Sequence, residues 1–328
     1  MPQKNLLTPE TSSMPCKLCG NNQVYVIARL SRSGTALRSV ICSDCGLVWS
    51  DPFPHNPRQF YEKDYRLEYK NTYTPKPKHV LRAGNIALTR LEKIKQLLGT
   101  SKTILDVGTG GGEFAYLLKS LGHDVHGTEP NRGYAEYSKA EYGLNLHIGF
   151  IQDSHYPPAS FDVITIWHVL EHTEDPYIVL QKLHSLLKAD GVLVVEVPNI
   201  EACCQAPKST FHEAHLFNFN LKSLIKMGEK AGLLGDSHLI SADGGNITVF
   251  FRKNAGAILT SDFRISDNAA YIMHQMQQHT CLKHYLSAKP YQRLLKRLCR
   301  SAAEINCIKG FDSNKGLLDQ LYQAHNKL

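Results

Sequence analysis

The sequence has no long apolar run and no apolar segment at its start. None of its 328 residues falls in a stretch of about 18 consecutive apolar residues, so we expect no membrane-spanning helix and no membrane partner. Residues Met1–Pro15 are polar and lack the apolar centre of a signal peptide. We therefore expect a cytoplasmic protein that is not secreted.

Long runs of one charge are also missing. The formal net charge is +7, and no extended Lys/Arg run occurs. This mild excess permits an anionic partner, such as a nucleotide-sugar, an acidic glycan or RNA, without requiring one. The length of the chain suffices for one large core with one or two small modules.

The most informative segment is a strand pattern that breaks into glycines. Residues 104–112 read Ile-Leu-Asp-Val-Gly-Thr-Gly-Gly-Gly, and a helical pattern follows from Phe114. A second strand pattern then ends at Glu129. This order is typical of the nucleotide-binding half of a doubly wound α/β sheet. The glycines allow close backbone approach to a ligand, and the helix N-terminus offers N–H donors to an anionic group.

The glycine spacing differs from that of a dinucleotide site. Gly108, Gly110 and Gly112 form G-x-G-x-G, whereas the dinucleotide fingerprint is G-x-G-x-x-G. Asp106 precedes them, where its carboxylate would repel a pyrophosphate but suits a ligand with an ammonium group. Glu129 can accept hydrogen bonds from both hydroxyls of a ribose. These features resemble D-x-G-x-G-x-G, the first motif of class I S-adenosylmethionine (SAM) methyltransferases.

The resemblance implies a fold and a set of SAM-binding residues. The expected fold is a Rossmann-like, doubly wound α/β sheet with a closing antiparallel strand. The three glycines would shape the methionine pocket, Asp106 would order it, and Glu129 would hold the ribose. Ile151 and Gln152, after the third strand, would flank the adenine, and Trp167 is also assigned to the cofactor site.

Strand and helix patterns alternate through the rest of this region, which favours a parallel sheet. The turn Asp243-Gly244-Gly245 predicts a closing hairpin. The expected strands are Ile104–Val107, Val125–Glu129, Leu146–Ile148, Val163–Trp167, Val192–Val197, His238–Ser241 and Asn246–Arg252. The expected helices are Ala87–Leu98, Glu113–Ser120, Tyr134–Tyr142, Tyr177–Leu187 and Leu221–Ala231.

The chain has nine cysteines, and without a secretion signal these favour metal ligation or free thiols over disulfides. Two matched knuckles, Cys16-x-x-Cys19-Gly and Cys42-x-x-Cys45-Gly, bracket a predicted hairpin. Four thiolates complete a tetrahedral zinc shell and leave no open position, so we expect a structural Zn²⁺. A redox-active C-x-x-C is the alternative, but redox chemistry needs only one cysteine pair and does not explain two matched pairs.

These patterns divide the chain into five predicted segments. They are a disordered leader over residues 1–15, a zinc ribbon over 16–50, a linker or lid rich in Pro and Tyr over 51–85, a methyltransferase core over 86–254, and a helical C-terminal extension over 255–328.

The fourth strand ends in His168-Val-Leu-Glu171-His172, which matches the inverted zinc-protease motif. Its place at the carboxyl end of a core strand, and the lack of an obvious third ligand, argue against a protease. In the SAM methyltransferases that the chain resembles, H-V-L-E-H lines the SAM and substrate pockets. The resemblance therefore makes His168 and Glu171 catalytic candidates, while His172 alternatively orders the following loop.

The same position lacks another motif. Methyltransferases that act on exocyclic amines of nucleic-acid bases have D/N-P-P-Y/F/W there, and this chain has Trp167-His-Val-Leu170. The difference argues against methylation of base amines.

A histidine pair follows the fifth strand, within residues 211–221. This segment is expected over the cofactor face of the sheet, and a histidine suits proton abstraction near neutral pH. His215 is our first candidate for the base and His168 the second; the alternative is a surface histidine pair without a function. Asn218 or Asn220 is expected to cap the next helix.

A second resemblance covers about residues 16–252. The four-cysteine ribbon, the SAM core, a Y-H-E-H-x-x-Y-F-S-L-like segment and a later G-G-S motif are similar to those of the nucleotide-sugar C-methyltransferases. The counterparts here are Cys16, Cys19, Cys42 and Cys45, then Asp106–Gly112, Phe211–Leu221 and Gly244-Gly245-Asn246. The chain departs from that family by one extra residue in this segment, which places Ala214 beside His215 where the family has Glu, and by a shorter tail.

Together these features predict a SAM-dependent methyltransferase with a structural zinc ribbon. The expected acceptor is a small polar molecule, preferably a sugar or nucleotide-linked sugar, methylated on carbon or oxygen. One alternative is a zinc-ribbon RNA methyltransferase, and another is a non-catalytic binding module with a SAM fold. The acceptor atom, the pathway and the oligomeric state are left open.

Overall fold

The computed structural model describes residues 8–54, 58, 75–254, 262–307 and 310–326. The aromatic residues of the predicted lid, from Phe60 to Tyr73, lie outside these ranges. The chain divides into two compact units, which are described separately. The ribbon unit comprises residues 1–55, 167–184 and 194–292, and the glycine-loop unit comprises residues 56–166, 185–193 and 293–328.

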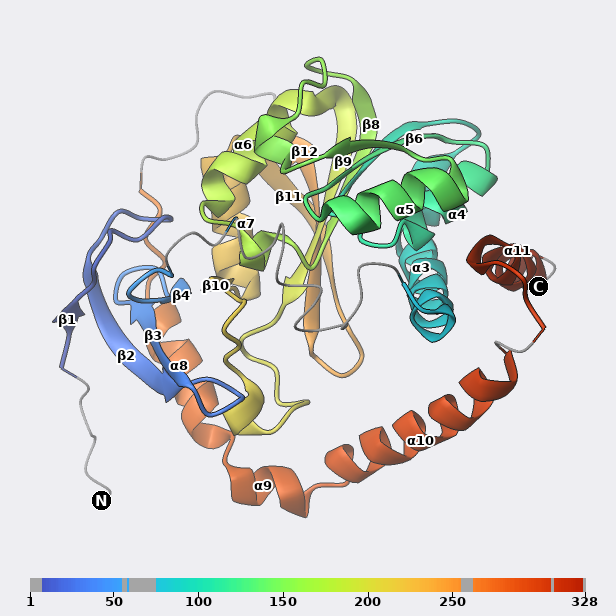
Figure 1. The fold of residues 1–328 in the computed structure, drawn as a ribbon. Helices are drawn as coiled ribbons and strands as arrows, with labels where there is room; N and C mark the ends of the chain where they lie inside the picture. The colour runs from blue at the N-terminus through green and yellow to red at the C-terminus, as the bar shows by residue number, and fades with distance from the viewer. Residues whose placement is uncertain (1–7, 55–57, 59–74, 255–261, 308–309, 327–328) are drawn as a thin grey trace. The chain divides into compact units, whose positions relative to one another are not determined.

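The expected α/β sheet is present (Figure 1). It has seven strands in the order β11-β12-β9-β8-β5-β6-β7. Strand β5 pairs in parallel with β6 and β8, β6 pairs in parallel with β7, and β11 and β12 form the predicted antiparallel hairpin. The strands are β5 (Thr103–Val107), β6 (Asp124–Glu129), β7 (Asn145–Ile148), β8 (Phe161–Trp167), β9 (Leu187–Pro198), β11 (Leu233–Ile240) and β12 (Asn246–Lys253).

Helix α3 (Pro77–Leu98) begins earlier in the chain than expected, so the predicted linker–core boundary falls inside it. A proline at the first helical position has a preset φ and loses no hydrogen bond there. Gly84 allows close packing with α11 (Asn314–Asn326), because a Cβ at this position would lie 2.7 Å from Leu318. Helices α4 (Glu113–Ser120) and α5 (Arg132–Tyr142) complete this group.

The C-terminal extension is helical, as predicted, and part of it belongs to the glycine-loop unit. In α10 (Lys289–Cys307), the buried carboxylate of Glu304 accepts two hydrogen bonds from Arg82, of 2.6 and 2.7 Å. In α11, the Tyr322 hydroxyl donates to the backbone oxygen of Glu113 at 2.8 Å. Glu113 directly follows the glycine motif and is the first residue of α4, so α11 supports the start of α4.

The ribbon unit contains a second, antiparallel sheet in the order β1-β2-β3-β4-β10 (Figure 1). Its strands are β1 (Glu10–Thr11), β2 (Gln23–Leu30), β3 (Ala36–Cys42), β4 (Val48–Ser50) and β10 (Phe217–Asn218). Strands β2 and β3 form the predicted hairpin. For residues 8–15, strand β1 corrects the prediction of a disordered leader, because Glu10 and Thr11 pair with β2 and Ser13 N donates to Asp51 Oδ1 at 3.0 Å. Residues 1–7 lie outside the described ranges.

Strand β10 lies within the histidine segment and was not predicted. Phe217 pairs with Trp49, and Ser50 N donates to the oxygen of Leu216 at 3.1 Å. The segment that follows β9 is therefore part of the ribbon sheet. Of the two candidate caps, Asn220 caps α7 (Leu221–Lys230) in a reciprocal capping box with Ser223.

Asn268 connects three parts of the ribbon unit. It is the first residue of α8 (Asn268–Gln278) and is fully buried. Its Nδ2 donates to the backbone oxygen of Cys45 at 2.8 Å, and its Oδ1 accepts from Asn220 Nδ2 at 2.8 Å. A Cβ at Gly46 would lie 2.6 Å from Asn268, so the second cysteine knuckle needs glycine to fit here.

The remaining helices are α6 (Pro176–Leu186) and α9 (Cys281–Leu286). Across the described part of the chain, no helix combines the length and the apolar character that a bilayer crossing requires.

Candidate functional site

The glycine loop has the predicted strand–turn–helix form between β5 and α4. Gly108, Gly110 and Gly112 have φ values of 72°, 60° and 88°, a region that favours glycine. A Cβ at Gly112 would lie 2.8 Å from Leu144 and 2.9 Å from Ser138. Both the backbone conformation and the space around the loop therefore demand glycine.

Two buried acids flank the loop in the same unit. Glu129, at the end of β6, accepts from Gly110 N at 2.8 Å and from Asn131 N at 3.0 Å. Asp106 accepts from Thr165 Oγ1 at 2.7 Å, and its burial raises its pKa to about 6. The structure thus brings together the predicted acids and glycines, and Glu129 fixes the loop through Gly110.

The other predicted cofactor residues lie at the ends of sheet strands. Ile151 is buried and Gln152 half-buried in a short 3-10 helix, η2 (Ile151–Asp153), after β7. Trp167 is buried at the end of β8. The contacts of these residues with a cofactor stay predictions.

In the ribbon unit, His168 lies between two carboxylates. Its Nδ1 is 3.4 Å from Glu171 Oε1, and its Nε2 is 3.4 Å from Glu196 Oε1. Burial alone would lower the pKa of His168, but the hydrogen bonds and charges of these two acids raise it to about 9. The residue has a φ of 55°, a left-handed conformation that costs energy outside glycine. Such strain is common where a side chain is held for a function.

Sequence reasoning missed Glu196. It lies in the apolar run of β9, is 4% exposed, and accepts a hydrogen bond from Thr248 Oγ1. A lone acid in a strand buried on both faces is costly unless it has partners. The isolated acid within this apolar run was the signal in the sequence. In the structure, Glu196 contacts His168 and Thr248.

Glu171 is the most deeply buried acid of this group, with 1% of its surface exposed. Its Oε1 is 3.4 Å from His168 Nδ1 and 3.8 Å from His172 Nε2. Burial would raise its pKa, but the contact with His168 and the charges of the nearby histidines lower it to about 2. Within the described residues, neither carboxylate oxygen has a hydrogen-bond partner that meets the usual geometry.

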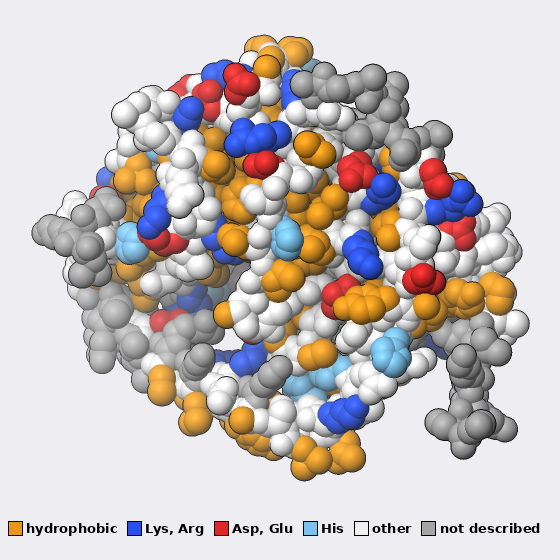
Figure 2. Space-filling model, turned by 180° about the vertical axis from the view of Figure 1, so that it is seen from behind, with side chains coloured by type: hydrophobic (Ala, Val, Ile, Leu, Met, Phe, Trp, Pro, Cys, Tyr) orange, Lys and Arg blue, Asp and Glu red, His pale blue; other side chains and the backbone are white. Residues whose placement is uncertain are grey.

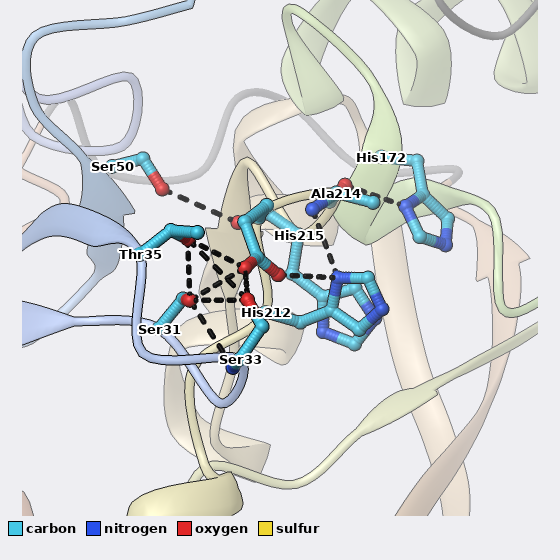
Figure 3. A network of polar contacts seen from close by, with 9 residues as sticks. Ser31, Ser33, Thr35, Ser50, His172, His212, Ala214 and His215 are labelled. Carbon is cyan, nitrogen blue, oxygen red and sulfur yellow. Dashed lines mark hydrogen bonds and ion pairs between the residues drawn. The ribbon is translucent and has the colours of Figure 1, made fainter. Parts of the chain in front are cut away.

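The histidine segment joins this group (Figure 3). The ring of His215 lies 5.0 Å from that of His172, edge to face, and stacks on that of His212 at 4.9 Å. Burial, followed by the charge of His172, lowers the pKa of His215 to about 3. The structure therefore places the predicted catalytic residues His168, Glu171 and His215 in one cluster.

The backbone of Ala214 orients two of the rings. Its backbone oxygen accepts from His172 Nδ1 at 2.7 Å, and its N–H donates to His212 Nδ1 at 2.9 Å. This hydrogen bond joins His172 to the histidine segment, whereas its predicted role in ordering the loop before Asp175 stays a prediction.

The turn of the ribbon hairpin holds the same segment from the other side (Figure 3). The carboxylate of Glu213 accepts from Ser31 Oγ at 2.5 Å, from Thr35 Oγ1 at 2.8 Å and also from Ser33 Oγ. These hydrogen bonds contribute to the lowered pKa of Glu213, which stays a carboxylate. The hairpin turn and β4 therefore both position the loop that presents His215.

The four knuckle cysteines form one cluster, as the spacing predicted. The sulfur of Cys16 is 3.4 Å from that of Cys45, and Cys19 is 3.4 Å from Cys42. These separations exceed a disulfide bond of about 2.05 Å. They approach the separation of about 3.8 Å between sulfurs that each lie 2.3 Å from a tetrahedral zinc. The donor set fits a thiolate-bound metal ion.

Charged side chains are mixed on the surface. On the face drawn in Figure 2, Lys and Arg side chains are scattered among acidic ones and form no continuous basic patch.

The comparisons with known proteins agree with the glycine loop and the sheet. A family model described as "Methyltransferase domain" matches residues 82–238. A ubiquinone biosynthesis O-methyltransferase of Paraburkholderia phymatum is 27% identical over 226 residues, 66% of this chain and 92% of that protein. One of Actinobacillus pleuropneumoniae is 37% identical over 134 residues, 38% of this chain and 56% of that protein.

A similar solved structure is the 1,6-didemethyltoxoflavin-N1-methyltransferase of Burkholderia thailandensis. It is 16% identical, with a TM-score of 0.44, and the match covers 65% of this chain and 97% of that one.

The sheet, the glycine loop with its acids and the domain match together define the class: the chain carries a class I SAM-dependent methyltransferase domain. The protein is a SAM-dependent methyltransferase with a four-cysteine cluster near its N-terminus. The alternative of a non-catalytic binding module is therefore wrong.

The geometry of Glu129 leads to a first prediction. Glu129→Ala should weaken SAM binding about 10- to 100-fold, because a hydrogen bond to a charged group contributes about 1.5–3 kcal/mol. Gly110→Val should have a similar effect, because valine strains the left-handed backbone of the loop. Isothermal calorimetry with SAM measures both.

Glu136→Ala is the matched control, since Glu136 is an exposed acid on α5 and should leave the affinity unchanged. If folded Glu129→Ala binds SAM as the unaltered protein does, the assignment of Glu129 to the ribose is wrong.

Proposed function

We propose that the protein transfers the methyl group of SAM to a small polar acceptor, preferably a sugar or nucleotide-linked sugar. The observation that carries this proposal is the cluster of the half-buried His168 and His215 with the buried Glu171 and Glu196, which offers proton-accepting and hydrogen-bonding groups to a hydroxyl-rich molecule. The relatives of Paraburkholderia phymatum and Actinobacillus pleuropneumoniae described above are named O-methyltransferases, which favours oxygen over carbon as the acceptor atom.

SAM supplies an electrophilic methyl group, and the glycine-loop unit would hold it. Gly108, Gly110 and Gly112 give the backbone room for the methionine part, and Glu129 faces this loop with a carboxylate suited to the ribose. Asp106 fixes the end of β5 through Thr165. Ile151 and Gln152 would flank the adenine, and Trp167 is a further cofactor-binding candidate, which belongs to the ribbon unit.

We assign the base to His168 and not to our first candidate, His215. A base with a pKa of about 3, as His215 has, accepts a proton poorly from a sugar hydroxyl. His168 has a pKa of about 9 and is a far stronger base once it has lost its proton. Glu171 and Glu196 would orient its ring and stabilise the imidazolium that forms.

We further propose that Cys16, Cys19, Cys42 and Cys45 hold a structural Zn²⁺. Four protein thiolates leave no open coordination position. The ion would fix the knuckles from which β2–β4 run, and those strands support the histidine segment through β10 and Glu213.

The zinc assignment gives a second prediction. Purified protein should contain about one thiolate-bound zinc per chain, and Cys42→Ser should lower the zinc content and destabilise the ribbon. Elemental analysis and thermal unfolding measure the two effects. Cys281→Ser is the control, because this exposed cysteine lies outside the cluster. A zinc-free protein prepared without chelators would contradict the assignment.

A screen for the acceptor gives a third prediction. With radiolabelled SAM, label should pass to sugars or nucleotide-sugars when these are tested beside RNA and proteins. Transfer to RNA alone would contradict a sugar acceptor and would favour the alternative of a zinc-ribbon RNA methyltransferase.

The choice of base gives a fourth prediction. His168→Ala should lower turnover about 10²- to 10⁴-fold and barely change SAM affinity. Because the base must be unprotonated, the rate of the unaltered enzyme should rise with pH up to about 9, the pKa of His168. A base with the pKa of His215 would give a flat rate from weakly acidic to alkaline pH.

Exposed His274 on α8 provides the control His274→Ala, which should keep full turnover. Full turnover in His168→Ala, with a pH-independent rate, would remove His168 from the mechanism.

A further inference from the structure

Glu171, His172 and His215 lie together in the ribbon unit, away from the four cysteines in the sequence. One carboxylate oxygen and one nitrogen from each ring lie within 4.8 Å of one another. Glu171 and His172 are adjacent in a short 3-10 helix, η3 (Leu170–His172), and His215 comes from the histidine segment. Two imidazoles and a carboxylate are a common ligand set for divalent transition metals.

We propose that Glu171, His172 and His215 form a second metal site, which binds one divalent transition-metal ion through two nitrogens and one oxygen. Sequence reasoning found no third metal ligand for the motif His168-x-x-Glu171-His172. The fold supplies it as His215, more than forty residues further along the chain.

The state of Glu171 is the first argument. Its carboxylate is 1% exposed, and within the described residues neither oxygen has a hydrogen-bond partner of normal geometry. A buried carboxylate without such partners is costly. His168 contacts both Glu171 and Glu196, so even when protonated it balances only one of two negative charges. A cation bound by Glu171 would balance the other.

The orientation of His172 is the second argument. Its Nδ1 donates to the backbone oxygen of Ala214 at 2.7 Å, which places the ring lone pair on Nε2. That Nε2 is the atom 3.8 Å from Glu171 Oε1. Metal-bound histidines usually donate their other N–H to a backbone oxygen or a carboxylate in this way.

The spacing is the third argument. Two ligands that each lie 2.0–2.1 Å from a tetrahedral zinc are about 3.3 Å apart. The separation of 3.8 Å between Glu171 and His172 needs only a small side-chain movement to reach this value. His215 is held nearby, since its backbone N–H donates to the oxygen of His212 at 3.0 Å and its ring stacks on that of His212.

Three protein ligands would leave a coordination position open, unlike the closed shell of the four cysteines. We assign this position to an oxygen of the methyl acceptor, whose hydroxyl a bound metal ion would make more acidic. This assignment rests on the proposed function, whereas metal binding itself does not.

Cobalt binding provides the test. Purified protein that retains its thiolate-bound zinc should bind about one Co²⁺ per chain in isothermal calorimetry. Its absorption spectrum should lack sulfur-to-metal charge transfer, because the ligands are nitrogen and oxygen. Glu171→Gln and His215→Gln should each weaken Co²⁺ binding at least about tenfold, whereas the exposed control His274→Gln should not change it.

Three results would overturn the proposal: no Co²⁺ bound by the unaltered protein, a sulfur-type spectrum, or unchanged Co²⁺ affinity in both variants. Circular dichroism and SAM binding report whether each variant is folded, and either folded variant decides the question. Methyl transfer to a sugar without a Co²⁺ site would sink this inference and leave the proposed function intact. A Co²⁺ site without sugar methylation would support this inference and contradict the proposed function.

Discussion

The pairing of β4 with β10 is the constraint on which the ribbon unit depends. It makes two residues of the histidine segment, Phe217 and Asn218, the last strand of the ribbon sheet. Their register against Trp49 and Val48 fixes where the preceding residues lie. Glu213 is then within reach of the hairpin turn. The four-cysteine knuckles therefore help to position the proposed active site through backbone pairing, without contact with a substrate.

Buried negative charge organises the proposed chemistry within this frame. Glu171 and Glu196 are both almost fully buried, and His168 lies between them. Two further histidines lie beside Glu171: His172, an oriented donor, and His215, whose pKa is lowered. The left-handed conformation of His168 is consistent with a residue held in place by these partners against its own backbone preference.

Local sequence patterns predicted the sheet, the hairpins, the glycine loop and the cysteine cluster, because each depends on residues close together in the chain. The expected start of α4 at Glu113 and the cap at Asn220 are confirmed. Strands β1 and β10 were missed, because two-residue strands have no periodicity and exist only through distant partners. Glu196 and the link between Glu171 and His215 were missed for the same reason: both contacts form only when the fold closes.

Ala214 and Glu213 also bear on how such proteins can diverge. The ribbon turn donates to Glu213, and the next residue orients His172 and His212 through its backbone. Replacement of the turn residues would leave the Glu213 carboxylate without its donors, and loss of one residue here would remove the backbone groups that orient two rings. We therefore expect the ribbon turn and the histidine loop to change together, although about 160 residues separate them in the chain.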